Sequence, residues 1–262
     1  MNVIFRAQRP GNGGADAART GLAFGRHGGR SINAFVTGGT GALGTSVTRL
    51  LLEQGHRVTA TWVVEAEATQ LLADLGSPPG LSTVEADVLD PGSVDRAVAG
   101  ARETFGEIDA LIHLVGAWFG GVPVHEHDLT AWRRMIDLNL TSAFVVCRAV
   151  LPGMLAGGRG RIVLVSSRTA IRDRKGQAAY AVAKAGLTVL AESIAEETRG
   201  TDVTANVVAP STMDTAPNRA SMPDADHAAW VSTEHVSAAI AFLACEEATA
   251  VRGAWLPVFG GV

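Results

Sequence analysis

The sequence is poor in several residue types, and each scarcity excludes a class of protein. It has only two cysteines, Cys147 and Cys245, which lie in apolar helical patterns without the spacing of metal ligands, so neither a disulfide nor a metal site is expected. Its longest apolar runs are strand-sized, shorter than the ~20 residues of a membrane span. The net charge of −4 gives no strong field for nucleic acid or an acidic membrane surface. We expect a soluble, cytoplasmic protein.

Tyrosine and lysine are the most informative scarcities. Tyr180 is the only tyrosine and Lys184 is one of two lysines, against twenty arginines. Both lie in the stretch "YAVAK", and residues four apart on a helix project from the same face. A phenol ionises near pH ~10, and an ammonium group nearby stabilises the phenolate and lowers that pKa. The spacing predicts an acid–base pair that acts on one ligand.

From Asn33 onward, short runs of Val, Ile and Leu alternate with helical patterns. Near-continuous apolar strands that alternate with helices are typical of a parallel sheet with helices on both faces. We expect one doubly wound α/β domain, a Rossmann fold, over residues 33–262. Residues 1–32 are rich in Gly and Arg without periodicity and are expected to form a flexible tail. The seven candidate strands are residues 33–37, 57–62, 81–86, 109–116, 161–166, 202–209 and 254–259.

The first candidate strand runs directly into "TGGTGALG", Thr37 to Gly44, which contains the spacing G-x-G-x-x-G. After a strand and before a helix, such glycines let the backbone approach a pyrophosphate, and the helix N-terminus supplies free N–H groups. A glycine-rich turn without a ligand is the alternative. At the end of the second strand, where an acid would indicate NAD and a base NADP, Trp62 stands, and Glu65 follows three positions later. NAD and NADP both stay open.

The chain resembles the short-chain dehydrogenases/reductases. Their signature is Tyr, three residues, Lys, with a Ser thirteen positions before the Tyr, and that position is Ser167 here, directly after "RIVLVS". The resemblance covers about residues 33–262. It implies an NAD(P)-dependent oxidoreductase that moves a hydride between nicotinamide and a carbonyl or alcohol carbon. Its implied catalytic residues are Asn139, Ser167, Tyr180 and Lys184.

The resemblance also gives each of these residues a role. Tyr180 would be the general acid in reduction and the base in oxidation. Ser167 would hold the substrate oxygen, Lys184 would bind the nicotinamide ribose and lower the Tyr180 pKa, and Asn139 would keep a water in the proton relay. The substrate would contact Ser167, Tyr180 and Trp118. The cofactor would contact Gly38, Gly39, Thr40, Gly41, Ala42, Leu43, Gly44, Trp62, Asp87, Val88, Val115, Gly116, Tyr180, Lys184, Pro210, Met213 and Thr215.

The chain departs from the family pattern in places. Most relatives read Asn-Asn-Ala-Gly where this sequence reads "HLVG", and we interpret His113 there as a structural residue at a strand end. Three segments, including "VGAWFGG" at Val115 to Gly121, are similar to dihydropteridine reductase, which makes that activity an alternative. A catalytically silent dinucleotide sensor is the alternative outside the enzymes.

Further expectations concern the surface. The basic residues between Ser167 and Tyr180 are either a solvated rim or an attractor for an anionic substrate; they are Arg168, Arg172, Arg174 and Lys175. Residues Ala216 to Trp230 are expected to form a mobile substrate lid. The resemblance implies a homo-oligomer, a tetramer or dimer, built through the helices around "NLTSAFVVCRAVLPGML" and Tyr180 and through the last strand.

Overall fold

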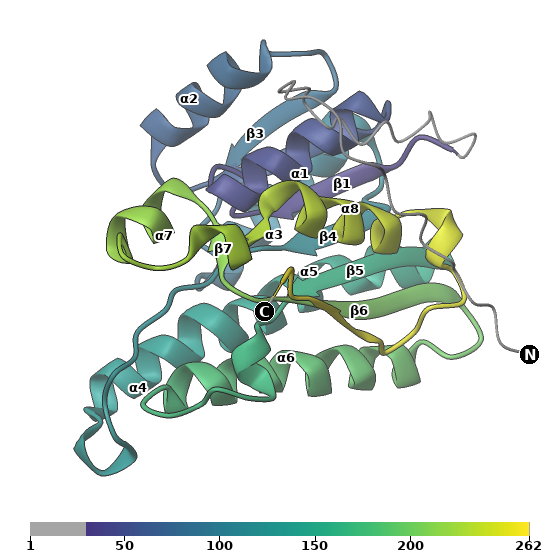
Figure 1. The fold of residues 1–262 in the computed structure, drawn as a ribbon. Helices are drawn as coiled ribbons and strands as arrows, with labels where there is room; N and C mark the ends of the chain where they lie inside the picture. The colour runs from purple at the N-terminus through teal and green to yellow at the C-terminus, as the bar shows by residue number, and fades with distance from the viewer. Residues whose placement is uncertain (1–29, 262) are drawn as a thin grey trace, which may run out of the picture.

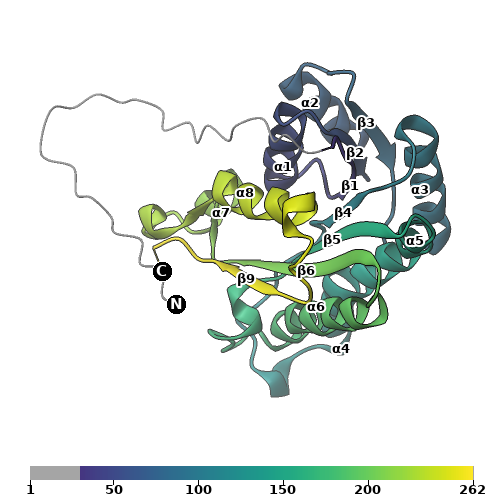
Figure 2. The ribbon, with the colours of Figure 1, turned by 90° about the vertical axis from the view of Figure 1, so that its right-hand side faces the viewer.

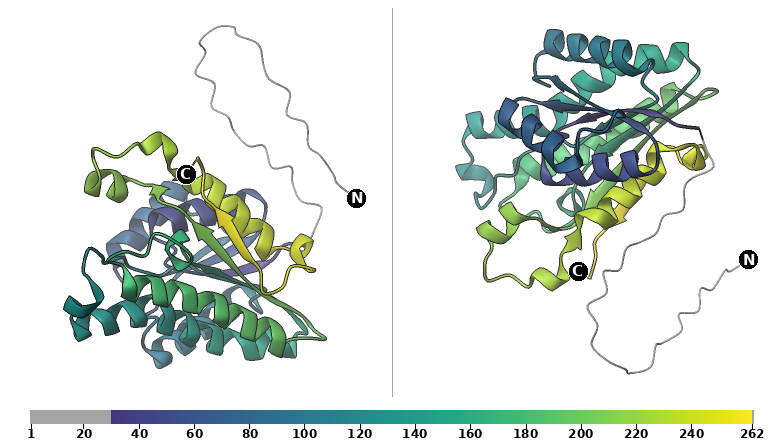
Figure 3. Two further views of the ribbon diagram at one scale, coloured as in Figure 1. Left: turned by 60° about the horizontal axis from the view of Figure 1, so that its bottom comes forward. Right: turned by 90° about the horizontal axis from the view of Figure 1, so that it is seen from above.

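The computed structural model describes residues 30–261, and a seven-stranded parallel sheet runs through them in the order β3-β2-β1-β4-β5-β6-β9 (Figure 1). All seven predicted strands are present, and the Rossmann fold is confirmed. Figure 3 shows β9 at the sheet edge beside β6. The strands are β1 Asn33–Thr37, β2 Arg57–Trp62, β3 Leu81–Glu85, β4 Ala110–His113, β5 Arg159–Val165, β6 Asp202–Pro210 and β9 Trp255–Val258.

Helices cover both faces of the sheet and form two apolar cores (Figure 2). On one face lie α3 (Pro91–Phe105), α5 (Ser142–Ala156) and α6 (Ala178–Glu197). On the other, α1 (Ala42–Glu53) packs against α8 (Thr233–Ala244), with α2 (Glu65–Leu75) beside α1. Two shorter helices, α4 (Leu129–Ile136) and α7 (Ala216–Ser221), follow β4 and β6. Short 3-10 turns occupy Val124–Glu126, Arg168–Ala170, His227–Ala229 and Glu246–Ala248.

The strand order fixes where a ligand can bind. From β1 the chain first adds β2 and β3 on one side of the sheet and then returns to add β4 and the later strands on the other side. β1 therefore has β2 on one side and β4 on the other. In an open parallel sheet, the crevice at such a switch point, outside the carboxyl ends of the strands, is the ligand site. Every loop that carries a predicted site residue starts at those carboxyl ends.

Two local features differ from the expected pattern. The segment "WRRMIDLNLTSAFVVCRAVLPGML" has one helical pattern, but a π-helical turn, Asp137–Thr141, divides it into α4 and α5. A two-residue parallel pair, β7 (Met213–Asp214) with β8 (Val231–Ser232), joins the two ends of the predicted lid. Both depend on contacts between distant segments, which local periodicity does not encode.

Several smaller predictions can be compared directly with the structure. Cys147 and Cys245 are buried free thiols, as expected. Most of the predicted tail, residues 1–29, lies outside the described residues. Ile32, which we assigned to that tail, is instead 4% exposed and belongs to the second core cluster, which also contains residues of α1 and α8.

Two helical segments, Leu129–Ala156 and Ala178–Glu197, are long and apolar enough to cross a membrane by length and composition alone. Their apolar residues, however, supply much of the first core cluster against the sheet. This packing is what a central helix of a globular domain requires, since a helix that covers a parallel sheet must itself be apolar.

His113, at the end of β4, is a buried structural residue, as predicted. Its Nδ1 lies 2.8 Å from the Thr37 hydroxyl and its Nε2 lies 3.1 Å from the Ser142 hydroxyl. Burial, and secondarily the charge of Lys184, lowers the pKa of His113 to about 3. The imidazole is therefore neutral at physiological pH, and it ties the start of the glycine loop to the first turn of α5.

We predict that His113 makes the protein less stable in mild acid. Unfolding restores the ordinary pKa of 6.5, so the unfolded chain takes up a proton that the folded chain excludes. Below pH 6.5 the free energy of unfolding should therefore fall, by up to about 1.4 kcal/mol per pH unit. Urea unfolding of His113→Asn should show a smaller acid loss than the parent. The matched control is His125→Asn at an exposed histidine; an equal loss in all three proteins would contradict the prediction.

Candidate active site

The structure brings most of the predicted site residues to one edge of the sheet. They lie in the loops after β1, β2, β3, β4, β5 and β6, or on the first two turns of α6. Because all of these strands are parallel, their carboxyl ends meet at the same edge. The Tyr–Lys pair, the glycine loop and Ser167 therefore lie at the same end of the sheet, where open parallel sheets have their ligand crevice, although 147 positions separate Thr37 from Lys184.

The glycine loop after β1 is close-packed against its neighbours. Gly38 has a φ of +70°, a conformation that glycine adopts without strain. A Cβ on Gly39 would lie 2.6 Å from the Cβ of Ala60 on β2, and a Cβ on Gly38 would lie 3.2 Å from the predicted cofactor residue Val115. A larger residue would push the loop out of the crevice, so the glycines hold the backbone where a pyrophosphate can reach it.

The N-terminus of α1 is open in a way that fits a dinucleotide. No side chain caps it, its N-cap residue is Gly41, and its first turn has no acid. Three other helices are capped by the side chain of the residue that precedes them: Asp90 before α3, Asp128 before α4 and Ser232 before α8. Free N–H groups and the positive end of the helix dipole favour an anion. The predicted residues Gly41, Ala42, Leu43 and Gly44 could therefore hold the cofactor phosphates.

Tyr180 and Ser167 form the centre of the crevice. The Ser167 side chain is close enough to the Tyr180 phenol to lower its pKa as a hydrogen-bond partner, and Ser167 also begins the short turn after β5, accepting from the Thr169 N–H at 3.2 Å. Burial raises the pKa of Tyr180, and the hydrogen bond with Ser167 lowers it by a smaller amount. The prediction that Lys184 draws this pKa below its ordinary value is therefore wrong for the chain alone, because desolvation of the phenolate outweighs the other effects.

Lys184 is a buried ammonium, 5% exposed. Its Nζ donates to the Val165 carbonyl at 2.9 Å and lies 5.8 Å from the centre of the Tyr180 ring. Burial lowers the pKa of Lys184 to about 8. Ser166, which sequence reasoning missed, fixes the backbone here: its hydroxyl donates to the Lys184 carbonyl at 2.7 Å. The lysine is thus held from both ends by the residues that terminate β5.

Asn139 is fully buried in the π turn, and its side chain is fixed by backbone groups. Its Nδ2 donates to the carbonyls of Ala117 at 2.9 Å and Met135 at 3.0 Å, and its Oδ1 accepts from the Ala117 N–H at 3.2 Å. The turn projects the amide toward the β4 loop, where it meets Lys184 at Gly116. A Cβ on Gly116 would lie 2.6 Å from Asn139 Oδ1 and 3.0 Å from Lys184 Nζ.

Two exposed aromatic residues, Trp118 and Phe119, lie in the loop after β4. Trp118 is 63% exposed, and its indole Nε1 donates to Gln177 Oε1 at 2.8 Å, which joins the β4 loop to the residue before α6. Phe119 makes an edge contact with His127, which makes another with Trp132. Gln177 was not predicted, since only this contact across 59 positions reveals it.

The loop after β6 contains the remaining predicted cofactor residues. Pro210 ends β6, and Thr215 caps α7 by accepting from the Asn218 N–H at 3.3 Å. The Met213 carbonyl accepts from Asn218 Nδ2 at 2.8 Å. The predicted lid, Ala216 to Trp230, contains α7 and the β8 approach; its mobility stays a prediction.

The basic rim is engaged within its own loop and with the C-terminal segment. Arg168 pairs with Asp173 at 3.0 Å, and Arg172 stacks on Phe259 at 4.9 Å. Arg174 donates to the carbonyls of Thr169 and Ala170. Three of the four basic residues therefore already have partners within the protein. These contacts favour the interpretation that the four residues form a solvated rim over the interpretation that they attract an anionic substrate.

The ends of β2 and β3, where the adenosine half of a dinucleotide would bind, have both predicted and unpredicted residues; we call this region the adenosine end. Trp62, at the end of β2, is half-buried, and Val88 is buried. One carboxylate oxygen of Asp87 accepts a hydrogen bond from the Leu89 N–H at 2.9 Å and so stabilises the turn that contains it. The unpredicted contact is between the glycine loop and α2: Thr40 donates its hydroxyl to Glu67 at 2.8 Å. Sequence reasoning considered Glu65 for this region and missed Glu67, whose side chain reaches the loop.

A glycine-lined crevice with an open helix end, next to a Ser–Tyr–Lys group, is the arrangement of a dinucleotide-dependent oxidoreductase. Comparison with known proteins places the chain further. The short chain dehydrogenase family profile matches residues 33–226. The chain therefore belongs to the short-chain dehydrogenase/reductase family, and it is an NAD(P)-dependent oxidoreductase.

Relatives within the family include two kinds of enzyme. The chain is 33% identical over 239 residues to the 3-oxoacyl-(acyl-carrier-protein) reductase FabG of Salmonella typhimurium, which covers 87% of this chain and 96% of that protein. It is 35% identical over 240 residues to the cis-4-hydroxycyclohexanecarboxylate dehydrogenase of Sinomonas cyclohexanicum, covering 87% and 95%. These relatives do not support the dihydropteridine reductase alternative, and the enzyme assignment displaces the silent sensor.

Solved structures agree with this fold. The crystal structure of gox2181 superposes with a TM-score of 0.83 at 30% identity, covering 88% of this chain and 95% of that one. A short-chain type dehydrogenase/reductase from Mycobacterium ulcerans also reaches 0.83, with 89% and 90% covered, and at 24% identity it supports the fold alone.

We predict that Gly116→Ala damages the site. The added methyl would press on Asn139 and Lys184, and such overpacking typically costs about 1–3 kcal/mol of stability. Turnover should fall at least about tenfold, because even a small displacement of Asn139 or Lys184 next to the predicted catalytic tyrosine lowers the reaction rate. The matched control is Gly100→Ala in α3, where a Cβ meets nothing within 4 Å and helix propensity favours alanine. Equal activity in the two variants, measured with stability by thermal unfolding, would contradict the close contact at Gly116.

Proposed function

We propose that Tyr180 is the proton donor and acceptor of the reaction, with Ser167 as the residue that holds the substrate oxygen. The observation that carries this proposal is the Ser167 side chain next to the buried Tyr180 phenol, at the end of the sheet where the α1 N-terminus is open. When bound, the nicotinamide cofactor supplies or accepts the hydride. The two hydroxyls share the charge that develops on the substrate oxygen.

Burial favours the neutral, protonated form of Tyr180. Its raised pKa keeps the phenol protonated at neutral pH, which suits it to donate a proton to a carbonyl oxygen in reduction. In oxidation the phenol must first lose that proton, so the same site favours oxidation at alkaline pH. Lys184 can bind the nicotinamide ribose and is charged below about pH 8, and Asn139 can hold a relay water beside it.

The substrate we infer is a small ketone or secondary alcohol with an apolar or ring-shaped body. Trp118 and Phe119 offer exposed aromatic surface at the mouth, which favours an apolar or ring-shaped substrate body. The rim arginines already have partners, so they contribute little free charge for an anion. One relative is a cis-4-hydroxycyclohexanecarboxylate dehydrogenase, whose substrate combines a ring alcohol with a carboxylate, and its ring agrees with a compact ring-shaped substrate body here.

We predict that Tyr180→Phe abolishes turnover while it leaves cofactor binding nearly intact. The phenyl ring keeps the packing but removes the only group that can exchange a proton with the substrate oxygen, an effect worth about 10²–10⁴-fold in rate. Steady-state kinetics with a carbonyl panel gives the first quantity, and calorimetric titration with NADH and NADPH gives the second. Turnover within a few fold of the parent would defeat the assignment of Tyr180 as acid and base.

The oligomeric state is also a proposal. Helices α5 and α6 lie on the same face of the sheet and leave large apolar side chains exposed: Phe144 at 51%, Leu155 at 45%, Val182 at 50% and Val189 at 62%. A patch of this kind is typical of a protein interface. We propose a homo-oligomer, a dimer or tetramer, that buries this face.

We also propose that the enzyme is cytoplasmic, because its two cysteines are buried free thiols, which a reducing compartment preserves. Secretion of the tagged protein by its native host would contradict this proposal.

We predict that Val189→Glu dissociates the oligomer, because a carboxylate on the proposed interface would have to be buried without a partner. Sedimentation at micromolar concentration should show the parent as a dimer or tetramer and the variant as smaller species. The control is Val124→Glu, at a valine that is 74% exposed on another surface. A parent protein that sediments as a monomer would refute the interface.

A further inference from the structure

The charges around the adenosine end of the crevice are all of one sign. Three segments frame this region: the glycine loop 37–44, the β2 end with the first turn of α2 at 62–69, and the β3 end at 85–95. None of them contains a lysine or an arginine. Together they contain six carboxylates: Glu65, Glu67, Glu85, Asp87, Asp90 and Asp95.

One of these carboxylates is held at the glycine loop itself. Glu67 is exposed on α2, and its Oε2 accepts from the Thr40 hydroxyl at 2.8 Å. Thr40 lies between Gly39 and Gly41, the residues that start the pyrophosphate-binding turn. The carboxylate is therefore fixed at the junction of the glycine loop and β2, where the adenosine ribose must lie if the phosphates occupy the α1 N-terminus.

The helix dipole does not offset this charge. The N-terminus of α2 lacks a side-chain cap, which alone would favour an anion, but its first turn already has Glu65 and Glu67. The arginine next in sequence, Arg96, has its Nη2 3.9 Å from Asp90. A ribose 2′-phosphate placed here would meet carboxylates and no cation from these segments.

We propose that this enzyme selects NAD(H) over NADP(H), with Glu67 as the specificity-determining residue. The Glu67 carboxylate can accept hydrogen bonds from ribose hydroxyls, and it repels a 2′-phosphate. This choice does not rely on an acid at the end of β2, since Trp62 stands there. The inference rests on the proposed dinucleotide site and deepens it.

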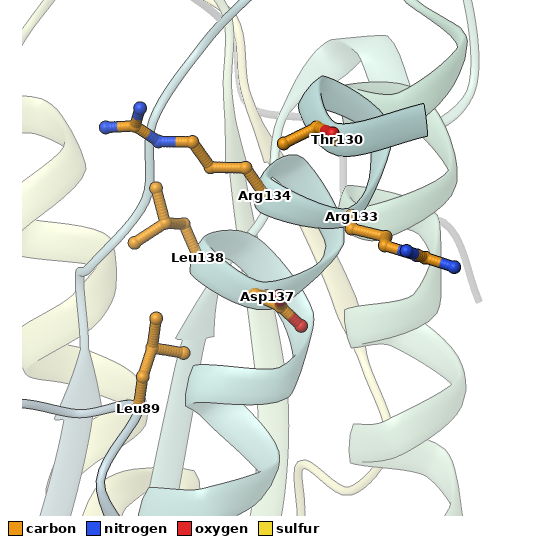
Figure 4. A pocket seen from close by; sticks show the side chains of 6 residues that line it. All are labelled: Leu89, Thr130, Arg133, Arg134, Asp137 and Leu138. Carbon is orange, nitrogen blue, oxygen red and sulfur yellow. The ribbon is translucent and has the colours of Figure 1, made fainter. Parts of the chain in front are cut away.

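A groove next to the loop after β3 is lined by arginines of α4. Arg133 and Arg134 of α4 line a cavity of about 450 Å³ together with Leu89, Thr130, Asp137 and Leu138. Figure 4 shows the two guanidinium groups projecting to opposite sides of α4. Leu89 after β3 lines this groove together with residues of α4 and the π turn, whereas Glu67 lies on α2 and does not line it. Arg134 therefore serves as a test of the alternative that a cation from α4 receives the phosphate.

Calorimetric titration of the whole purified protein with NADH and with NADPH tests the proposal without requiring a substrate. The dissociation constant for NADPH should exceed that for NADH by at least about tenfold. In Glu67→Gln, which keeps an acceptor for Thr40 and removes the charge, the ratio should shrink by about threefold or more, chiefly through tighter NADPH binding. The matched control is Asp74→Asn, the same loss of charge at the far end of α2, which should leave the ratio unchanged.

Salt dependence gives a second measurement that needs no variant. Screening shortens from about 10 Å at 0.1 M salt to about 3 Å at 1 M, so the preference for NADH should narrow as salt rises if repulsion causes it. Equal affinities for the two cofactors, or a ratio that Glu67→Gln does not move, would overturn the proposal. A loss of NADPH binding in Arg134→Ala would overturn it in favour of the α4 arginine.

The same titration separates this inference from the proposed function. Tight binding of both cofactors with equal affinity would remove the selectivity and leave the oxidoreductase intact. Binding of neither cofactor would overturn both, because the crevice would then hold no dinucleotide at all.

Discussion

The burial of one ammonium group, that of Lys184, is the constraint on which the rest of the site depends. A charge removed from water must be compensated, or its pKa shifts, and both effects are present here. The Val165 carbonyl compensates it at 2.9 Å, and the pKa falls to about 8. The space for Nζ exists because Gly116 has no side chain. Lys184, the end of β5 and the end of β4 therefore constrain one another.

The π turn completes this arrangement from another direction. It lets Asn139 direct its amide at the backbone of Ala117, across the β4 loop, while Ser142 in the next turn contacts His113. His113 in turn contacts Thr37 at the start of the glycine loop. A series of buried polar contacts thus links the loop that can hold the cofactor phosphates to the turn beside the reacting groups. Such networks fix a geometry when every member is satisfied.

The sequence predicted those parts of the protein that depend on local pattern. The seven strands are continuous apolar runs, and the glycine loop and the "YAVAK" helix have fixed spacings, so their positions follow from the chain alone. The parts it did not predict depend on contacts between distant segments. The pairing of Trp118 with Gln177 spans 59 positions, and that of Thr40 with Glu67 spans 27. The pKa of Tyr180 was predicted in the wrong direction, since spacing reports the neighbouring lysine but not the desolvation that opposes it.

The scarcity of tyrosine has a practical consequence. Tyr180 is the only phenol in all 262 residues, and it lies against Ser167 in the crevice. Any ultraviolet absorbance change caused by tyrosinate formation therefore originates at Tyr180, the proposed proton donor. The protein contains its own optical reporter, which follows the ionisation of a single side chain without a label or an introduced probe.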